Sequence, residues 1–255
     1  TGGTDSITGL PFVGELKGFA EYTTVSPLTT LAYHLKEEDN TLTTETAVDL
    51  LFASSSVLFG VQLDVADKDV MLNKDYVAES VLNDSKQAVA AQSIATYLES
   101  VTEMVGSAVE GSDTTNFTSK QGKVQGYKSI ARQISRTEGA KIAIKHGDLF
   151  DLVTLPGGGK YGQGGKITTD QRNSINTTLV GVKTQLDTLA KEQQFTSNYL
   201  TSQIQGINRG VKNLYAKEVR KVINTGKANE KFSFNPVLEI QQEESTSLNR
   251  IEKGK

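Results

Sequence analysis

The stretch YTTVSPLTTLAYHL, residues 22–35, passes from one local pattern to another within a few positions. Its first residues are largely β-branched, which favours extended backbone. Ser26 then supplies a side-chain oxygen of the kind that caps a helix, and Pro27 follows at the first helical position, where its missing N–H costs no hydrogen bond. The leucines that follow lie three and four residues apart: Leu28, Leu31 and Leu35. The stretch therefore predicts an extended segment that ends where a helix with one apolar face begins.

The same spacing of apolar residues recurs along most of the chain and predicts a mainly α-helical protein, a bundle of long amphipathic helices. The further candidate helices cover residues 39–60, 74–109, 117–146, 170–198 and 199–225. Thr43 is an expected N-cap, Thr168 or Thr169 is another, and Gly60 is an expected stop signal. Between residues 60 and 74 we expect a connector with one turn capped by Asp67.

Short β segments are predicted at both ends of the chain and beside a glycine-rich loop. Residues 7–25 contain three glycines and a proline, which favour strands joined by turns. The apolar run 150–155 is a predicted strand that enters the glycine-rich loop 156–166. Near the end of the chain, Phe232, Phe234 and Val237 are spaced as in an exposed or edge strand.

The charge changes sign along the chain. Residues 1–111 hold 5 Lys and Arg against 17 Asp and Glu, a net charge of −12, and residues 112–255 hold 22 against 13, a net charge of +9. Either the two halves pack on one another, or the acidic end of one molecule meets the basic end of the next. The resulting regions are an extended segment 1–25, an acidic helical region 26–111, a basic helical region 112–228, and a strand with a charged tail, 229–255.

The composition excludes several classes of site. The chain has no cysteine, which rules out disulfides, zinc–thiolate centres and cysteine nucleophiles. It has only four prolines, which leaves room for long helices. No stretch approaches the ~20 apolar residues of a membrane-spanning helix, so no transmembrane segment is expected. Because the sequence begins at Thr1 without a charged and apolar leader, we expect a processed mature chain or an excised domain.

No catalytic pattern stands out, so no enzyme activity, catalytic residue or cofactor is predicted. Gly157, Gly159 and Gly162 match the spacing G-x-G-x-x-G, but that motif needs a helix beginning inside it to face a pyrophosphate, and here the helix is expected only near residue 168. His34 and His146 have no metal-ligand partner nearby in the sequence, which favours structural or surface roles.

Two stretches, residues 1–9 and 64–69, offer oxygen ligands of the kind that Ca²⁺ prefers, although neither matches the twelve-residue calcium loop. Calcium is thus the one cofactor that the sequence leaves open.

A basic stripe is the main candidate for partner binding. Lys128, Arg132 and Arg136 repeat four residues apart, as do Lys141 and Lys145. Like charges at this spacing repel one another by a few tenths of a kcal/mol each, which favours an anionic partner, although a solvated helix face is the simpler explanation of the pattern. Together with the three apolar residues of the C-terminal strand, these five basic residues are the predicted assembly or partner-binding residues.

The first hundred residues resemble a helical module of large bacterial secreted and cell-surface proteins of the adhesin-like kind. In that module a turn of the form GG-D-x-x-TG-x-P leads through an extended segment into a helix start V-[ST]-PLTTL. The matching residues are Gly2, Gly3, Asp5, Thr8, Gly9, Pro11 and residues 25–31. The resemblance implies a secreted or cell-surface location and no catalytic residues.

Two functions are predicted. The leading one is an extracellular structural protein that assembles head-to-tail with copies of itself into a filament, sheath, surface layer or adhesive fibre. The terminal segments would pair between subunits by strand addition. The alternative is a surface module that binds an anionic glycan, lipopolysaccharide or nucleic acid through its basic helices, 120–145 and 209–221.

Overall fold

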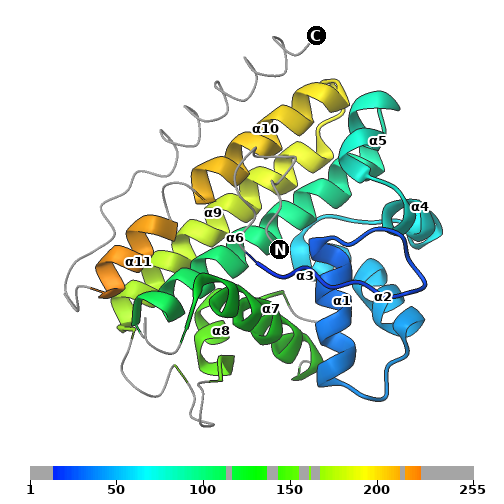
Figure 1. Ribbon diagram of the computed structural model, residues 1–255. Coiled ribbons are helices and arrows are strands. Elements are labelled where there is room, and N and C mark those ends of the chain that lie inside the picture. The colour runs from blue at the N-terminus through cyan, green and yellow to red at the C-terminus, as the bar shows by residue number, and fades with distance from the viewer. Residues whose placement is uncertain are drawn as a thin grey trace.

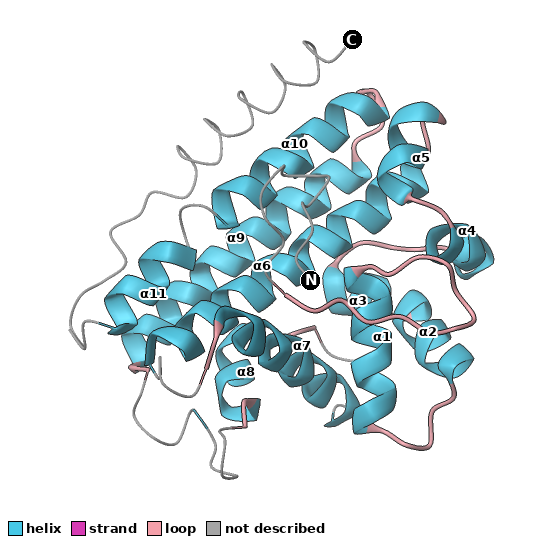
Figure 2. Ribbon diagram, viewed as in Figure 1, coloured by secondary structure: helices cyan, strands magenta, loops and turns pink. Residues whose placement is uncertain are grey.

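The computed structural model describes residues 14–112, 117–136, 143–154, 161, 167–212 and 216–224. Within these ranges the chain is helical, as predicted, and contains no β-strand (Figure 2). The elements before the central helix are α1 (Pro27–Glu38), α2 (Thr44–Ala53), α3 (Ser55–Phe59), a 3₁₀ turn η1 (Val65–Asp67), α4 (Lys68–Asn73) and α5 (Tyr76–Leu82). The remaining helices are α6 (Lys86–Ser112), α7 (Ser119–Arg136), α8 (His146–Leu152), α9 (Thr169–Lys191), α10 (Ser197–Gly210) and α11 (Ala216–Asn224).

Three of the predicted helix caps are confirmed. Ser26 caps α1 and is followed by Pro27, and Thr43 and Thr168 cap α2 and α9. In each case the cap side chain accepts a hydrogen bond from the backbone three residues later, whose side chain contacts the backbone of the cap in return. Gly60 ends α3 with a φ of +82°, a left-handed conformation that glycine adopts without strain.

Several predicted helices are shorter than expected. The candidate helix 74–109 is divided into α5 and α6, because Asp84 adopts a φ of +51° and interrupts it. The candidate 39–60 is divided in two, and 170–198 ends early, at Lys191. The candidate 117–146 does not reach its predicted end, because residues 143–145 are not helical, and in 199–225 the described helices are α10 and α11. The connector before α5 contains η1 and α4. The residue that caps η1 is Asp64 and not the predicted Asp67, because the Asp64 carboxylate accepts a hydrogen bond from the N–H of Ala66.

The predicted strand at residues 150–155 is wrong, because residues up to Leu152 belong to α8. Leu149 and Phe150 in this helix and Val153, which follows it with extended backbone, are all fully buried. At the glycine-rich loop the described residues show one backbone bond, from Tyr161 N–H to the carbonyl of Val153 at 3.0 Å.

The terminal β segments are described only in part. Residues 14–25 form an irregular segment with a turn at residues 20 and 21, and they pair with no strand among the described residues. Thr24 N–H instead bonds to the carbonyl of Leu72 at 3.0 Å, which ties this segment to α4. Residues 1–13 and 225–255, including Phe232, Phe234 and Val237, lie outside the described residues.

Helix α6 lies at the centre of the bundle, and α1, α5, α7, α9, α10 and α11 pack around it (Figure 1). Most of its residues are buried on every side, so it has no solvent-facing stripe of the usual kind. Its interior-facing residues include many small ones, such as Ala88, Ala91, Ser93 and Gly106, which let the surrounding helices approach closely. The core sits along this helix.

The closest approach is the crossing of α6 with α7. A Cβ added to Gly122 would lie 2.5 Å from the carbonyl oxygen of Gly106, and one added to Gly126 would lie 2.8 Å from the Cα of Thr102. Only glycine therefore fits at residues 122 and 126 without moving a helix backbone. The sequence spacing G-x-x-x-G on α7 thus sets the distance between the two helices.

Candidate functional site

The acidic and basic halves of the chain pack on one another. Among the described residues, five ion pairs join a carboxylate before residue 112 to a basic side chain after it: Glu15–Lys120, Glu38–Arg132, Glu99–Lys212, Glu103–Lys123 and Glu110–Arg220. The interpretation in which the two halves of one chain pack on one another therefore holds for these ten side chains. Their opposite charges are matched within one subunit and do not support attraction between neighbouring copies.

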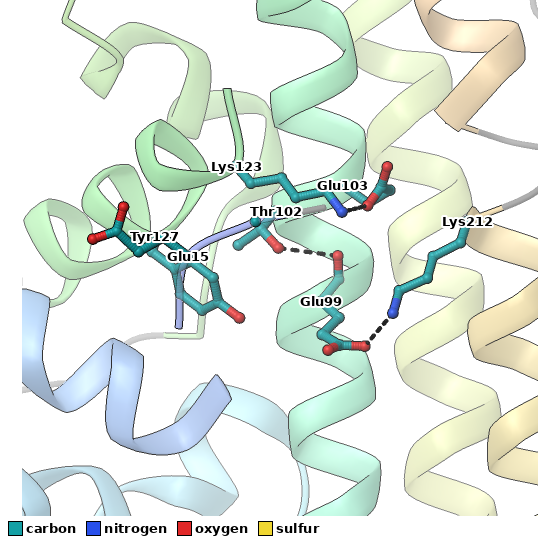
Figure 3. A pocket seen from close by; sticks show the side chains of 8 residues that line it. Glu15, Glu99, Thr102, Glu103, Lys123, Tyr127 and Lys212 are labelled. Atoms are coloured by element: carbon teal, nitrogen blue, oxygen red, sulfur yellow. Dashed lines mark hydrogen bonds and ion pairs between the residues drawn. The ribbon is translucent and has the colours of Figure 1, made fainter. Parts of the chain in front are cut away.

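Two of these pairs form a charged seam where α6, α7 and the end of α10 meet (Figure 3). Lys212 Nζ lies 2.9 Å from Glu99 Oε2, which also accepts a 2.7 Å bond from the side-chain amide of Asn208. One turn along α6, Glu103 pairs with Lys123 of α7. The four ionised side chains are only 11–15% exposed, so water screens them little.

The charged seam leaves little open space. The cavity among its residues and Tyr127 has a volume of about 10 Å³, room for a single water molecule. Burial raises the pKa of the Tyr127 phenol well above its ordinary value, so this group stays protonated. Because each ammonium in the seam is paired and the space is filled, the seam holds three helices together and has no room for a substrate.

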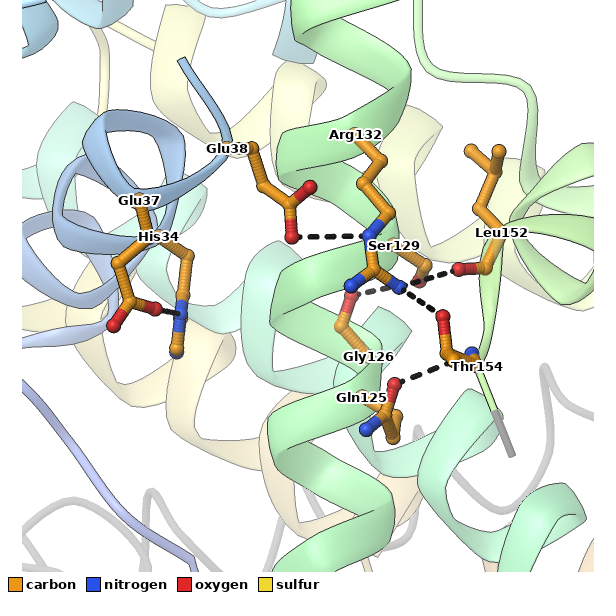
Figure 4. Close-up of polar contacts among 9 residues, drawn as sticks. All are labelled: His34, Glu37, Glu38, Gln125, Gly126, Ser129, Arg132, Leu152 and Thr154. Atoms are coloured by element: carbon orange, nitrogen blue, oxygen red, sulfur yellow. Dashed lines mark hydrogen bonds and ion pairs between the residues drawn. The ribbon is translucent and has the colours of Figure 1, made fainter. Parts of the chain in front are cut away.

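Arg132, one of the predicted partner-binding residues, is engaged inside the subunit (Figure 4). Its Nε donates to Glu38 Oε1 at 3.0 Å, and its Nη1 donates to the carbonyl of Leu152 at 2.7 Å and to the hydroxyl of Thr154 at 2.9 Å. Arg132 therefore joins α7 to the ends of α1 and α8. The guanidinium suits this role because its planar set of donors can serve three acceptors at once.

His34 is fully buried beside this network (Figure 4). Its Nδ1 lies 2.8 Å from Glu37 Oε2, and its ring stacks on Tyr127 at a centroid distance of 6.2 Å. Burial lowers the pKa of His34, a shift that the neighbouring Glu37 carboxylate partly opposes. The structural role predicted for His34 fits these contacts.

The other predicted basic residues occupy different environments. Lys128 is half-buried on α7, Arg136 is exposed at the end of that helix, and Lys145 is exposed just before α8. Lys141 lies outside the described residues. Partner binding by this group stays a prediction, but Lys145 is distinguished by its place on a groove.

The α8–α9 groove is the larger open space described here, with a volume of about 500 Å³. Residues 143–148 form one wall, and the other wall is one flank of α9: Asn173, Asn176, Val180, Lys183 and Thr184. Sequence reasoning named Lys145 alone among these for binding. The spacing of three and four on α9 was visible in the sequence, but such a polar stripe is typical of any solvated helix.

His146 forms the inner end of this groove and is 3% exposed. The hydroxyl of Tyr97, on α6, lies 2.6 Å from His146 Nε2, and the side-chain oxygen of Asn176 lies 3.2 Å from Nδ1. Because an amide oxygen only accepts, the ring proton sits on Nδ1 and Tyr97 donates to Nε2. Burial, with a smaller contribution from Lys183, lowers the pKa of His146 to about 4, so the ring is neutral at neutral pH.

A second surface feature lies at the end of the bundle where α5 stops and α10 begins. Three apolar side chains near these helix ends are exposed, and we refer to them together as the end patch: Val81 at 39%, Leu82 at 78% and Phe195 at 42%. Two hydrogen bonds join the segment after α5 to the start of α10: Lys86 Nζ donates to the carbonyl of Phe195 at 2.6 Å, and the side chain of Asp84 accepts from the N–H of Ser197 at 2.8 Å.

The described residues contain no group of three or more histidine and acidic side chains arranged to hold a metal ion. In the stretch 64–69, Asp64 caps η1, and residues 1–9 lie outside the described part, so calcium binding stays a prediction. No helix in the described ranges is long and apolar enough to cross a membrane.

Comparison of the chain with protein-family models, curated proteins and solved structures gives no match. The resemblance of the first hundred residues to an adhesin-like module therefore stays a prediction.

Proposed function

We propose that the chain is a non-enzymatic structural protein that assembles with copies of itself in secreted or cell-surface material of a bacterium, such as a filament, sheath, surface layer or adhesive fibre. The compartment rests on the resemblance of the first hundred residues. The assembly rests on one observation, the end patch, where three apolar side chains stand in solvent on a fixed backbone.

The mode of contact that we propose differs from pairing of opposite charges. Five ion pairs already match ten charged side chains of the two halves inside the subunit, which lowers the unmatched charge of the halves from −12 and +9 to −7 and +4 and weakens attraction between an acidic end and a basic end. Burying a side chain such as Leu82 or Phe195 contributes about 1.5–3 kcal/mol, which makes apolar contact the stronger source of association.

An end patch that meets the same patch on a second copy gives a two-fold pair, which is a closed arrangement. A longer assembly needs a second contact on each subunit. The predicted C-terminal strand, with Phe232, Phe234 and Val237, is our candidate for that contact, through strand addition.

Sedimentation velocity of the purified chain over a range of concentrations tests the proposal. We expect a reversible dimer or larger species that Leu82→Glu weakens at least about tenfold, because a charge in an apolar contact removes more than about 1.4 kcal/mol. Val57→Glu is the matched control, since Val57 is 45% exposed on α3, away from the end patch. A monomer at every concentration contradicts the proposal.

Salt separates the two modes of contact. At about 1 M NaCl the Debye length is about 3 Å, so association through opposite charges weakens, whereas apolar association persists. Association that disappears in high salt would indicate head-to-tail pairing of opposite charges between subunits and would contradict apolar contact.

The alternative function, binding of an anionic glycan, lipopolysaccharide or nucleic acid, is favoured by a different observation. Within the predicted basic segment 209–221, Arg209 is buried at the end of α10, and Lys212 and Arg220 pair with Glu99 and Glu110. Lys145 instead lies on the α8–α9 groove. Retention on heparin that salt reverses, in a chain that stays monomeric, would favour this alternative.

A further inference from the structure

The α8–α9 groove combines the size of a small-ligand site with polar side chains on both walls. Its volume of about 500 Å³ falls inside the ~300–1,000 Å³ range of ligand pockets. Its α9 wall is a single flank of the helix, while Ile175, Leu179, Val182 and Leu186 on the neighbouring flank are buried in the core. Core packing therefore fixes which way the groove wall faces.

The opposite wall is also held in place. The side-chain amide of Gln133, itself 8% exposed, bonds to the backbone of Lys145 on both sides: Oε1 accepts from the N–H at 2.8 Å, and Nε2 donates to the carbonyl at 3.0 Å. One residue later, His146 is fixed by Tyr97 and Asn176. A wall positioned before a ligand arrives loses little conformational freedom when it binds.

The groove has more donors than acceptors. Lys145 and Lys183 line it, and Asp148 is the single carboxylate among the described lining residues. The side-chain oxygen of Asn176 is used by His146, which leaves its amide N–H groups as donors toward the groove. Because burial keeps His146 neutral, the net charge of these side chains is about +1 at neutral pH.

The apolar part of the lining is small and aliphatic. Val180 is 47% exposed, and Ile144 lies on the facing wall. The one aromatic ring among the described lining residues is the imidazole of His146, which is only 3% exposed, so this lining offers no exposed ring for the stacking that recognition of nucleobases uses. Ammonium groups and amides around a short aliphatic floor suit a ligand with hydroxyl groups and a carboxylate.

We propose that the α8–α9 groove binds a carboxylate-bearing sugar, as found in a segment of an acidic polysaccharide. Lys145 and Lys183 contact the carboxylate from the two walls. Asn173, Asn176 and Thr184 bond the hydroxyl groups, and Val180 packs on the carbon skeleton. This site is separate from the end patch, so the proposal stands whether or not the chain assembles with copies of itself.

Titration calorimetry of the full chain with oligogalacturonate tests the proposal, with a neutral oligosaccharide of the same length as the comparison. We expect Lys145→Gln and Lys183→Gln each to weaken oligogalacturonate binding about tenfold, the loss expected for a charge-assisted bond of about 1.4 kcal/mol. Lys145→Arg is expected to restore most of the affinity, because the charge returns and Gln133 holds only the backbone of this residue.

The control is Lys191→Gln, which removes a lysine from the same helix outside the groove lining. Circular dichroism confirms that each variant remains folded. Equal affinity for the neutral oligosaccharide overturns the proposal, as does a Lys191→Gln variant that binds as weakly as the groove variants. The proposal of a sugar ligand is also overturned if the chain binds a single-stranded oligonucleotide and not oligogalacturonate, and if the groove variants lose that binding. That result would assign the groove to nucleic acid.

Discussion

The charged seam and the α8–α9 groove use the same side-chain types and differ in how the charges are matched. In the seam, Lys123 and Lys212 each face a glutamate, and the remaining space holds about one water. In the groove, Lys145 and Lys183 share the described lining with one carboxylate, around a far larger space. Pairing closes the seam and makes it part of the fold, whereas the groove retains donors that a ligand can use.

The largest effect is expected where the seam depends on the close crossing of α6 and α7. Gly122→Ala is expected to lower the free energy of unfolding by about 3 kcal/mol, because its methyl group meets backbone that cannot move away. Denaturation in urea measures the loss.

The matched control is Gly181→Ala in the middle of α9, where an added Cβ meets nothing within 4 Å. Here the better helix propensity of alanine should raise stability by about 0.5–1 kcal/mol. Changes of opposite sign in the free energy of unfolding of the two variants support a tight crossing of α6 and α7. Equal gains in stability from both substitutions would refute it.

A similar loss is expected from breaking one pair of the charged seam. Glu103→Gln leaves the ammonium of Lys123 poorly matched in a site only 11–15% exposed, and we expect it to cost about 3 kcal/mol. In the groove, Lys145→Gln should change stability by less than about 0.5 kcal/mol, because this side chain is exposed. Urea denaturation of both variants measures the two changes in the free energy of unfolding. Comparable losses would contradict the difference that we infer between the charged seam and the groove.

His146 links the groove to the core and should make stability depend on pH. Its pKa is about 4 in the folded chain against an ordinary value of 6.5, so the unfolded chain takes up the proton first as the pH falls. The stabilisation from the neutral ring is complete above pH ~6.5 and is lost as the pH falls toward ~4, with a loss of about 2 kcal/mol between pH ~7.5 and ~5.

Replacing His146 with glutamine should remove this share of the pH dependence. His34, whose pKa is also lowered by burial, remains in the variant and contributes its own part with the same sign. Thermal unfolding of both proteins across this pH range gives the difference, and parallel pH profiles would rule out a buried neutral His146.

The smallest effect is expected at an exposed pair. Lys191 lies 2.7 Å from Asp187 on α9, but its side chain is 65% exposed. We expect Lys191→Ala to change the free energy of unfolding by no more than about 0.5 kcal/mol, because water and salt screen the pair. A loss approaching that of Glu103→Gln would mean that burial does not separate the two kinds of pair.

Local signals in the sequence predict the helix starts well. Ser26, Thr43 and Thr168 each carry a side-chain oxygen directly before an apolar repeat, and each caps a helix. The interruption at Asp84 escapes such reasoning, because Asn and Asp are tolerated inside helices and adopt positive φ only when the tertiary structure requires a turn. The run 150–155 looks like a strand because a short apolar stretch fits either structure when its partners are unknown.

The sites are less predictable than the helices. Lys145 could be named from its charge, but its partners across the groove come from α9, and only the fold brings them together. The charged seam has the same origin, since Glu99 and Lys212 are far apart in the chain. The net charge along the sequence is compatible with packing of the two halves within one chain and with pairing between copies. Only the structure shows how the halves pack.

The central position of α6 bears on how the chain reaches its fold during synthesis. The helix is covered by α1 and α5, made before it, and by α7, α9, α10 and α11, made after it. Its cover is therefore complete only when the last of these helices leaves the ribosome. We expect the nascent chain to stay incompletely folded until then, and neither charge half to form a stable domain when expressed alone.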